Sequence, residues 1–283
     1  MNNDQISMLL AYMIQSQSSN GFVQNFLFPF LLSAISAIIG AYAAYYLLKR
    51  SELMAEERRK LDLLNKTSIL AMDAFTQMIA IKQDYIKKLS NCDPVIRAFN
   101  TPFIKGDFQK IEIPSGLMSL IALSIKEDGN LKWSQPWQFM ALRSNYNKTL
   151  ENWSLRNEID AECRSMLLVE KATGYFTLDQ IYQIVPEKHL VKWIESTELA
   201  LVMTDDMLIL INSLLDQLPE ITRKLVSSKA LNKYGALDRW NIGEFNTKML
   251  DRVPEADYFN IASLFQMSEA ELKYHFRSTI SPP

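Results

Sequence analysis

The stretch FVQNFLFPFLLSAISAIIGAYAAYYLL, from Phe22 to Leu48, contains no charged side chain. A helix needs about 20 apolar residues to cross a bilayer, because each residue adds only about 1.5 Å to its length. A helix that begins at Phe28, with Pro29 in its first turn, and ends at Leu48 would be about 31 Å long. A start nearer Phe22 with a kink at Pro29 is the alternative. The sequence therefore predicts one membrane-spanning helix within residues 22–48.

The residues on either side of this segment predict its orientation. Before it, the chain carries one charged side chain, Asp4, whereas basic residues follow it directly. Tyrosine suits the membrane interface, and basic residues favour the cytoplasmic side. We therefore expect residues 1–21 to form a short extracytoplasmic tail and the rest of the chain to be cytoplasmic, in a bacterial inner membrane. The predicted interfacial anchors are Tyr42, Tyr45, Tyr46, Lys49 and Arg50.

Three other interpretations of the apolar segment stay open. It could be a signal peptide cleaved near Ala41-Tyr42-Ala43, although no basic residue precedes it and it is long for that role. It could be the core helix of a soluble protein, although 27 uncharged residues are difficult to bury in a chain of this size. A second membrane pass would have to use Ile6 to Ile14, which is too short to span.

One face of the predicted membrane helix consists of small residues. Small side chains let two helix backbones approach closely in lipid, where no hydrophobic force drives helices together. The sequence offers no second membrane helix for this face, so we expect it to bind another copy of the chain or the membrane helix of another protein. The alternative is that its serines line a pore in a larger ring. The predicted packing residues are Ser33, Ser36, Ala37, Gly40, Ala41 and Ala44.

After the membrane segment, the pattern is helical throughout, so the predicted fold class is all-α. Between Lys49 and Leu89 there is no Gly or Pro, and apolar residues recur at alternating spacings of three and four. This spacing is typical of a coiled-coil seam and predicts a stalk helix over residues 49–91. Residues 92–283 are predicted to form a cytoplasmic bundle of six or seven helices.

Local signals predict the boundaries inside this bundle. Thr177-x-x-Gln180 and Ser268-x-x-Glu271 are capping boxes that each predict a helix start. Pro219 is expected to open a new helix after a long apolar one. The alternation of residues 108–113 could form a short strand, although no partner strand is evident.

The composition provides little support for an enzyme. The chain has two histidines, two cysteines and eight glycines, and none of them forms a metal-ligand spacing, a phosphate-binding loop or a nucleophile motif. We therefore predict no catalytic residue, no metal and no cofactor. The 30 basic and 32 acidic residues nearly balance, so we also predict no binding to nucleic acid.

Two acidic groups stand out. Glu158, Asp160 and Glu162 are expected to lie on a solvated helix surface. The pair Asp205-Asp206 interrupts an apolar helix, and a buried member would need a cationic partner such as Arg223 or Lys224.

These observations favour a single-pass, membrane-anchored assembly protein. We expect it to contact lipid, to self-associate through its membrane helix, and to bind an unidentified cytoplasmic protein. A membrane-disrupting or pore-forming effector with a helical sensing domain is the second hypothesis. A membrane-bound helical enzyme of an unrecognised type is the third.

Overall fold

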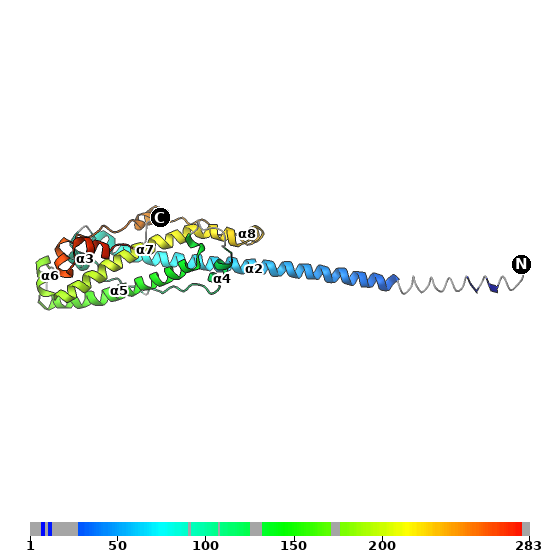
Figure 1. Cartoon of the computed structure of the whole chain (residues 1–283), viewed down its shortest axis with the longest axis horizontal. Helices are drawn as coiled ribbons and strands as arrows, with labels where there is room; N and C mark the ends of the chain where they lie inside the picture. The colour runs from blue at the N-terminus through cyan, green and yellow to red at the C-terminus, as the bar shows by residue number, and fades with distance from the viewer. Residues whose placement is uncertain are drawn as a thin grey trace. The chain divides into compact units, whose positions relative to one another are not determined.

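The computed structural model describes residues 7–8, 11–12, 28–89, 92–106, 108–124, 132–170 and 176–278. Every regular element in these ranges is a helix, which confirms the all-α prediction. The chain divides into two compact units, residues 1–58 and residues 59–283. The first described long helix, α2 (Phe28–Tyr85), begins in the first unit and continues into the second (Figure 1).

In the first unit, α2 presents its apolar side chains to the surroundings. The described part of α2 begins at Phe28, and Pro29 is its second residue, so both predicted starts stay open. Residues 22–27 lie outside the described part of the chain. Among the described residues, α2 is the one helix that is long and apolar enough to cross a membrane, judged by length and composition. None of the residues in its most apolar stretch is buried.

The second unit is built on three long helices: the 59–85 part of α2, α5 (Pro136–Glu170) and α7 (Glu187–Leu225) (Figure 1). Side chains join them pairwise. Tyr85 of α2 stacks on Trp153 of α5 with ring centroids 5.5 Å apart, and the Trp153 indole donates to Thr204 Oγ1 of α7 at 2.8 Å. Trp153 and Tyr85 are fully buried, as are Trp133 and Trp193, so aromatic rings fill much of this core.

Shorter elements surround the three long helices, and both predicted capping boxes are present at their helix starts. The α-helices are α3 (Pro94–Asn100), α4 (Leu117–Ser124), α6 (Leu178–Ile184), α8 (Ser228–Tyr234), α9 (Gly243–Thr247), α10 (Ala262–Phe265) and α11 (Glu269–His275). The 3-10 helices are η2 (Ile86–Lys88), η3 (Lys132–Ser134), η4 (Lys248–Leu250) and η5 (Phe259–Ile261).

Two local predictions were wrong. Pro219 does not open a helix, because it lies inside α7, which continues to Leu225. Leu218, Ile221 and Leu225 are buried on both sides of the proline, so their packing outweighs its lost backbone hydrogen bond. This is a case in which tertiary contacts override a local breaker.

The described residues 108–113 form no strand. Instead, the side chain of Asn147 takes the place of a strand partner for Ile111. Its Oδ1 accepts from the Ile111 N–H at 3.0 Å, and its Nδ2 donates to the Ile111 carbonyl at 3.2 Å. Because one amide satisfies both backbone groups, this extended segment needs no sheet.

Candidate functional site

The residues predicted to pack the membrane helix all lie in α2, in its exposed first part. Ser33, Ser36, Ala37, Gly40, Ala41 and Ala44 are exposed, and so are the three tyrosines, Lys49 and Arg50. A Cβ atom added to Gly40 would meet no atom within 4 Å. The Lys49 Nζ lies 6.0 Å from the centre of the Tyr45 ring, so those two anchors are neighbours. No other segment that the structure describes therefore covers this face.

In the second unit, α7 carries three buried carboxylates, and each forms an ion pair with a different element. Glu198, Asp205 and Asp206 are at most 4% exposed. Arg97 of α3 pairs with Glu198 at 2.8 Å, and Lys82 of α2 pairs with Asp205 at 2.6 Å. Arg252, after η4, pairs with Asp206 at 2.7 Å. We call Glu198, Asp205 and Asp206 the α7 carboxylates.

The predicted partners of Asp205-Asp206 were wrong. Arg223 lies 18 residues beyond Asp205 on the same helix, which corresponds to about 27 Å at 1.5 Å per residue. Its side chain cannot reach that distance, so the cations had to come from other elements. A signal for one of them is present in the sequence, since Lys82 occupies a position in the otherwise mostly apolar 3,4 series of α2.

The same charges fix a segment near the C-terminus, residues 251–258, which we call the strap. Lys82 Nζ donates to the Asp251 carbonyl at 2.5 Å, and Arg97 donates to the Pro254 carbonyl at 2.6 Å. The Val253 N–H donates to the second oxygen of Asp205 at 2.7 Å. The strap has no regular structure of its own here, so the buried charges supply the partners for its backbone.

Burial dominates the electrostatics of these carboxylates. It raises the pKa of Asp205 above its ordinary value, although the nearby Lys82 ammonium acts in the opposite direction. It likewise raises the pKa of Glu198, against the lowering effect of Arg97. In both cases, therefore, the desolvation of the charged carboxylate opposes the attraction of its cationic partner.

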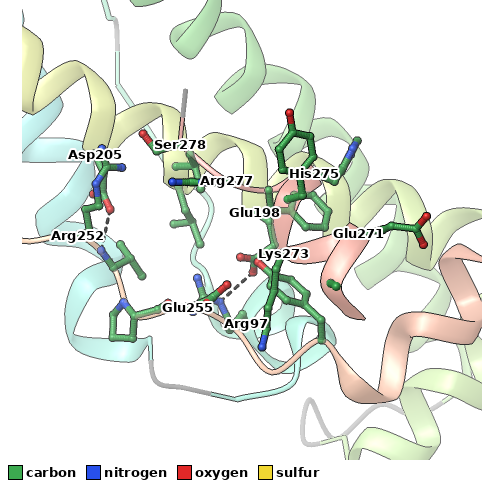
Figure 2. A pocket seen from close by; sticks show the side chains of 18 of the residues that line it. Arg97, Glu198, Asp205, Arg252, Glu255, Glu271, Lys273, His275, Arg277 and Ser278 are labelled. Carbon is green, nitrogen blue, oxygen red and sulfur yellow. Dashed lines mark hydrogen bonds and ion pairs between the residues drawn. The ribbon is translucent and has the colours of Figure 1, made fainter. Parts of the chain in front are cut away.

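A cavity of about 1500 Å³ opens beside the strap. Figure 2 shows it bounded by α7, the strap, α11 and the residues that follow α11. Glu198 and Asp205 lie at its inner wall together with Leu201 and Val202. Its outer wall carries Lys273, Tyr274, His275 and Arg277, among others. The cavity is therefore lined by charges of both signs and by a few apolar side chains.

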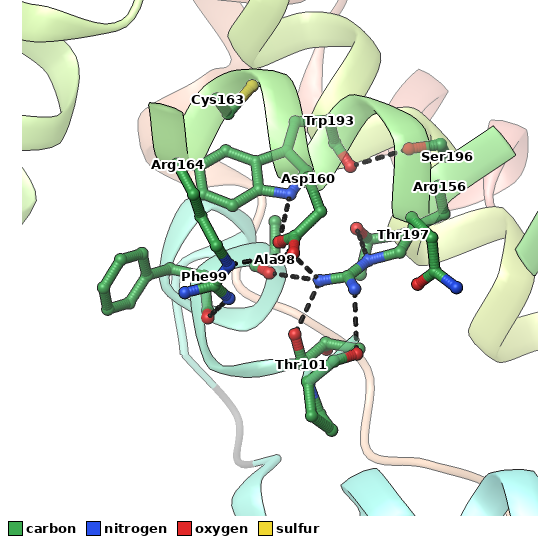
Figure 3. Close-up of polar contacts among 12 residues, drawn as sticks. Ala98, Phe99, Thr101, Arg156, Asp160, Cys163, Arg164, Trp193, Ser196 and Thr197 are labelled. Atoms are coloured by element: carbon green, nitrogen blue, oxygen red, sulfur yellow. Dashed lines mark hydrogen bonds and ion pairs between the residues drawn. The ribbon is translucent and has the colours of Figure 1, made fainter. Parts of the chain in front are cut away.

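A second buried polar group has a structural role (Figure 3). Arg156 of α5 is fully buried, and its guanidinium donates to the carbonyls of Ala98, Thr101 and Pro102 at 2.6–2.9 Å. Burial lowers the pKa of Arg156 to about 10, and Asp160 partly offsets that effect. Because its donors are used on the end of α3 and the turn after it, Arg156 fixes that turn against α5.

Asp160 completes this group, which corrects the prediction of a solvated acidic surface. Its carboxylate accepts from Arg156 at 3.1 Å, from Arg164 at 2.8 Å and from the Trp193 indole at 3.2 Å. It is 1% exposed, whereas Glu158 and Glu162 are exposed as expected. Asp160 lies four residues after Arg156 and seven after Trp153, so it shares their buried side of α5.

Among the cysteines and histidines, Cys163 is buried and His275 lies at the surface. Burial raises the pKa of the Cys163 thiol to about 12, so it is neutral at physiological pH. His275 lies 3.5 Å from Glu195 at the surface. No group of three or more His, Cys, Asp or Glu residues there is arranged to hold a metal ion.

Compared with known proteins, the chain matches no family model, no curated protein and no solved structure. The functional argument therefore depends on this chain alone.

Proposed function

We propose that this protein is a single-pass, membrane-anchored assembly protein whose helical body binds another protein in the cytoplasm. The observation that carries the proposal is the exposure of residues 28–48 along α2. Large apolar side chains there are 49–72% exposed, including Phe30, Ile38 and Tyr42. Residues 59–283 form a compact unit that contains its own core.

The energy involved supports lipid as the solvent for this segment. Burying one Leu, Ile or Phe side chain is worth about 1.5–3 kcal/mol, so nine of them amount to more than about 13 kcal/mol. That is comparable to the whole stability of a typical domain, roughly 5–15 kcal/mol. The nine exposed side chains are Phe28, Phe30, Leu31, Leu32, Ile35, Ile38, Ile39, Leu47 and Leu48.

The distribution of basic residues supports a cytoplasmic location for the helical body that follows the apolar segment. Basic residues follow the apolar segment at Lys49 and Arg50 and again at residues 58–60, whereas residues 5–48 carry no charge. By the positive-inside bias, the N-terminal residues then lie outside the inner membrane. The open face of small residues, centred on Gly40, supports self-association of the membrane helices.

Fractionation of the full-length chain tests the anchor. We expect the protein to sediment with membranes, to stay there in alkaline carbonate and to be released by detergent. The double variant Ile38→Asp/Ile39→Asp should shift it to the soluble or degraded pool, because each Asp at the centre of a span costs about 2.5–3.5 kcal/mol. Ile69→Asp is the matched control, since Ile69 is 59% exposed on the same helix outside the segment.

Two results would contradict the proposal. One is full-length protein that is monodisperse in buffer without detergent, which would make residues 28–48 part of a soluble assembly. The other is a mature chain whose mass shows cleavage near residue 43, which would make the segment a signal peptide. Fusions to a C-terminal fluorescent protein and to alkaline phosphatase test the orientation; an active phosphatase would place the body outside.

A further inference from the structure

Within residues 59–283, α2 carries an uncovered strip of side chains. Ile69 is 59% exposed and Met72 is 38% exposed, and Thr76 and Ala80 are exposed as well. These four residues follow one another at spacings of three and four, so they lie on one side of the helix. We call them the outer strip of α2.

The core of this unit lies on the opposite side of the same helix. Ala74 and Met78, each two positions from Thr76 and therefore roughly half a turn around the helix, are completely buried. A second chain can therefore approach the outer strip without displacing any packed segment that the structure describes.

The side chains of the strip suit a protein contact. Ile69 and Met72 are large and apolar, Ala80 is small, and the Thr76 hydroxyl donates to the Met72 carbonyl at 2.9 Å. Because that hydroxyl already has an acceptor in its own helix, burying Thr76 leaves no donor unpaired. None of the four positions carries a charge, and the nearby Asp73 is exposed at the edge of the strip.

The strip repeats the helical positions of the face of small residues around Gly40. α2 is one helix from Phe28 to Tyr85, and a separation of 36 residues corresponds to about ten complete turns. Each residue of the strip therefore has a counterpart on the small-residue face, namely Ser33 for Ile69, Ser36 for Met72, Gly40 for Thr76 and Ala44 for Ala80. Two α2 helices that pack nearly parallel through the small-residue face thus bring their outer strips together.

Membrane insertion also restricts how two copies meet. Chains inserted with the same orientation have parallel α2 helices, and a symmetric pair places each residue near the same residue of the other copy. Once the membrane helices associate, the second contact forms at a high effective concentration, so a strip with only two large apolar side chains is sufficient. These arguments select a second copy of this chain as the occupant.

We therefore infer that the outer strip of α2 packs on the same strip of a second copy, so that the two α2 helices pair from the small-residue face as far as Ala80. The inference rests on the proposed function, because it extends self-association of the membrane helices to the helical body. It assigns a contact that the small-residue face alone does not include.

Disulfide cross-linking of the full-length chain in isolated membranes tests the contact. Single cysteines replace Ile69 or Met72 in a Cys92→Ser background, in which the other native cysteine, Cys163, is buried. A disulfide requires Cα atoms within about 7 Å, so we expect roughly tenfold more linked dimer from either variant than from Leu155→Cys. Leu155 is a matched control, because it is apolar, 49% exposed and lies on α5 in the same unit.

Charge introduced into the strip tests its contribution to affinity. In Ile69→Glu/Met72→Glu, carboxylates of both copies meet in the contact and repel each other. We expect the dissociation constant of the dimer, measured by energy transfer between labelled chains in detergent, to rise roughly tenfold with an unchanged circular dichroism spectrum. The control is Leu155→Glu/Leu168→Glu, at two exposed apolar positions of α5, and should leave the dissociation constant unchanged.

Equal cross-linking at Ile69, Met72 and Leu155, or an unchanged dissociation constant in Ile69→Glu/Met72→Glu, would overturn the inference. Gly40→Cys in the same membranes separates this failure from failure of the proposed self-association. Cross-linking at Gly40 but at neither Ile69 nor Met72 would show that the membrane helices pack and then diverge, which refutes the outer-strip contact alone. An absence of cross-linking at all three positions would refute self-association as well.

Discussion

The first 21 described residues of α2 and the middle of α7 are both helical and both rich in apolar side chains, yet their burial is opposite. Residues 28–48 of α2 carry no charge and none of them is buried. In α7, Glu198, Asp205 and Asp206 are almost completely buried, each with a cation from another element. The difference shows that the available partner, and not the polarity of a side chain alone, decides what is buried.

The comparison predicts that each buried charge needs a partner of opposite charge. The largest loss of stability is expected at Asp160, which compensates Arg156. Asp160→Asn keeps the shape but leaves Arg156 without its carboxylate partner in the interior. We expect the free energy of unfolding to fall by about 4 kcal/mol, the typical cost of breaking a buried ion pair. Urea denaturation of the detergent-solubilised chain, followed by circular dichroism, measures it.

Glu158→Gln is the control for this substitution, because Glu158 is exposed on the same helix. It should change the free energy of unfolding by no more than about 0.5 kcal/mol. A similar loss in both variants would mean that the burial of Asp160 does not matter.

A somewhat smaller effect is expected at Lys82 on α2. Lys82→Met removes the cation that compensates the buried Asp205 carboxyl group, so we expect a loss of about 3 kcal/mol. The double variant Lys82→Met/Asp205→Leu removes both charges and should regain part of that loss, since apolar pairs often replace buried ion pairs without cost. A double variant that is less stable than Lys82→Met would show that the ion pair itself is strongly stabilising. Lys87→Met, at an exposed position of η2, is the control.

On the exposed side of the comparison, Gly40→Ile tests whether a second membrane helix packs on α2. A Cβ atom at this position meets no other segment that the structure describes, so the fold of residues 59–283 should be unaffected. We expect self-association in an inner-membrane reporter to weaken about tenfold, which is about 1.4 kcal/mol. Ile38→Ala, on the opposite side of the helix, should leave the signal unchanged. An unchanged signal in Gly40→Ile would remove self-association through this face.

The smallest effect is expected at the exposed ion pair between Lys110 and Glu151. Its length of 2.7 Å is nearly that of the Lys82–Asp205 pair, but both side chains are 60% exposed. Lys110→Ala should therefore change the free energy of unfolding by less than about 0.5 kcal/mol. A loss as large as that of Lys82→Met would show that distance, and not burial, sets the cost.

Much of the local structure could be predicted from the sequence. The 3,4 spacing before Leu89 and the two capping boxes describe interactions between residues at most a few positions apart, and these interactions are encoded locally. The failures at Pro219 and at residues 108–113 share a cause. In both, contacts from distant parts of the chain replaced the local preference.

The candidate cavity could not be predicted in this way. Its walls come from α7, the strap and α11, and Arg97 reaches Glu198 across 101 residues of sequence. Spacing along the chain contains no information about such pairs. Lys82 was visible as a charge among apolar positions, but neither its partner nor the strap that it binds could be read from that position.

The sequence by itself determined the all-α class, the long uncharged segment and the charge asymmetry beside it, because these properties depend on composition and on the 3.6-residue period of a helix. Only the tertiary structure decided which carboxylates are buried, which cations compensate them and where the cavity opens. Those features depend on desolvation and on distances of about 3 Å between groups that are far apart in the chain.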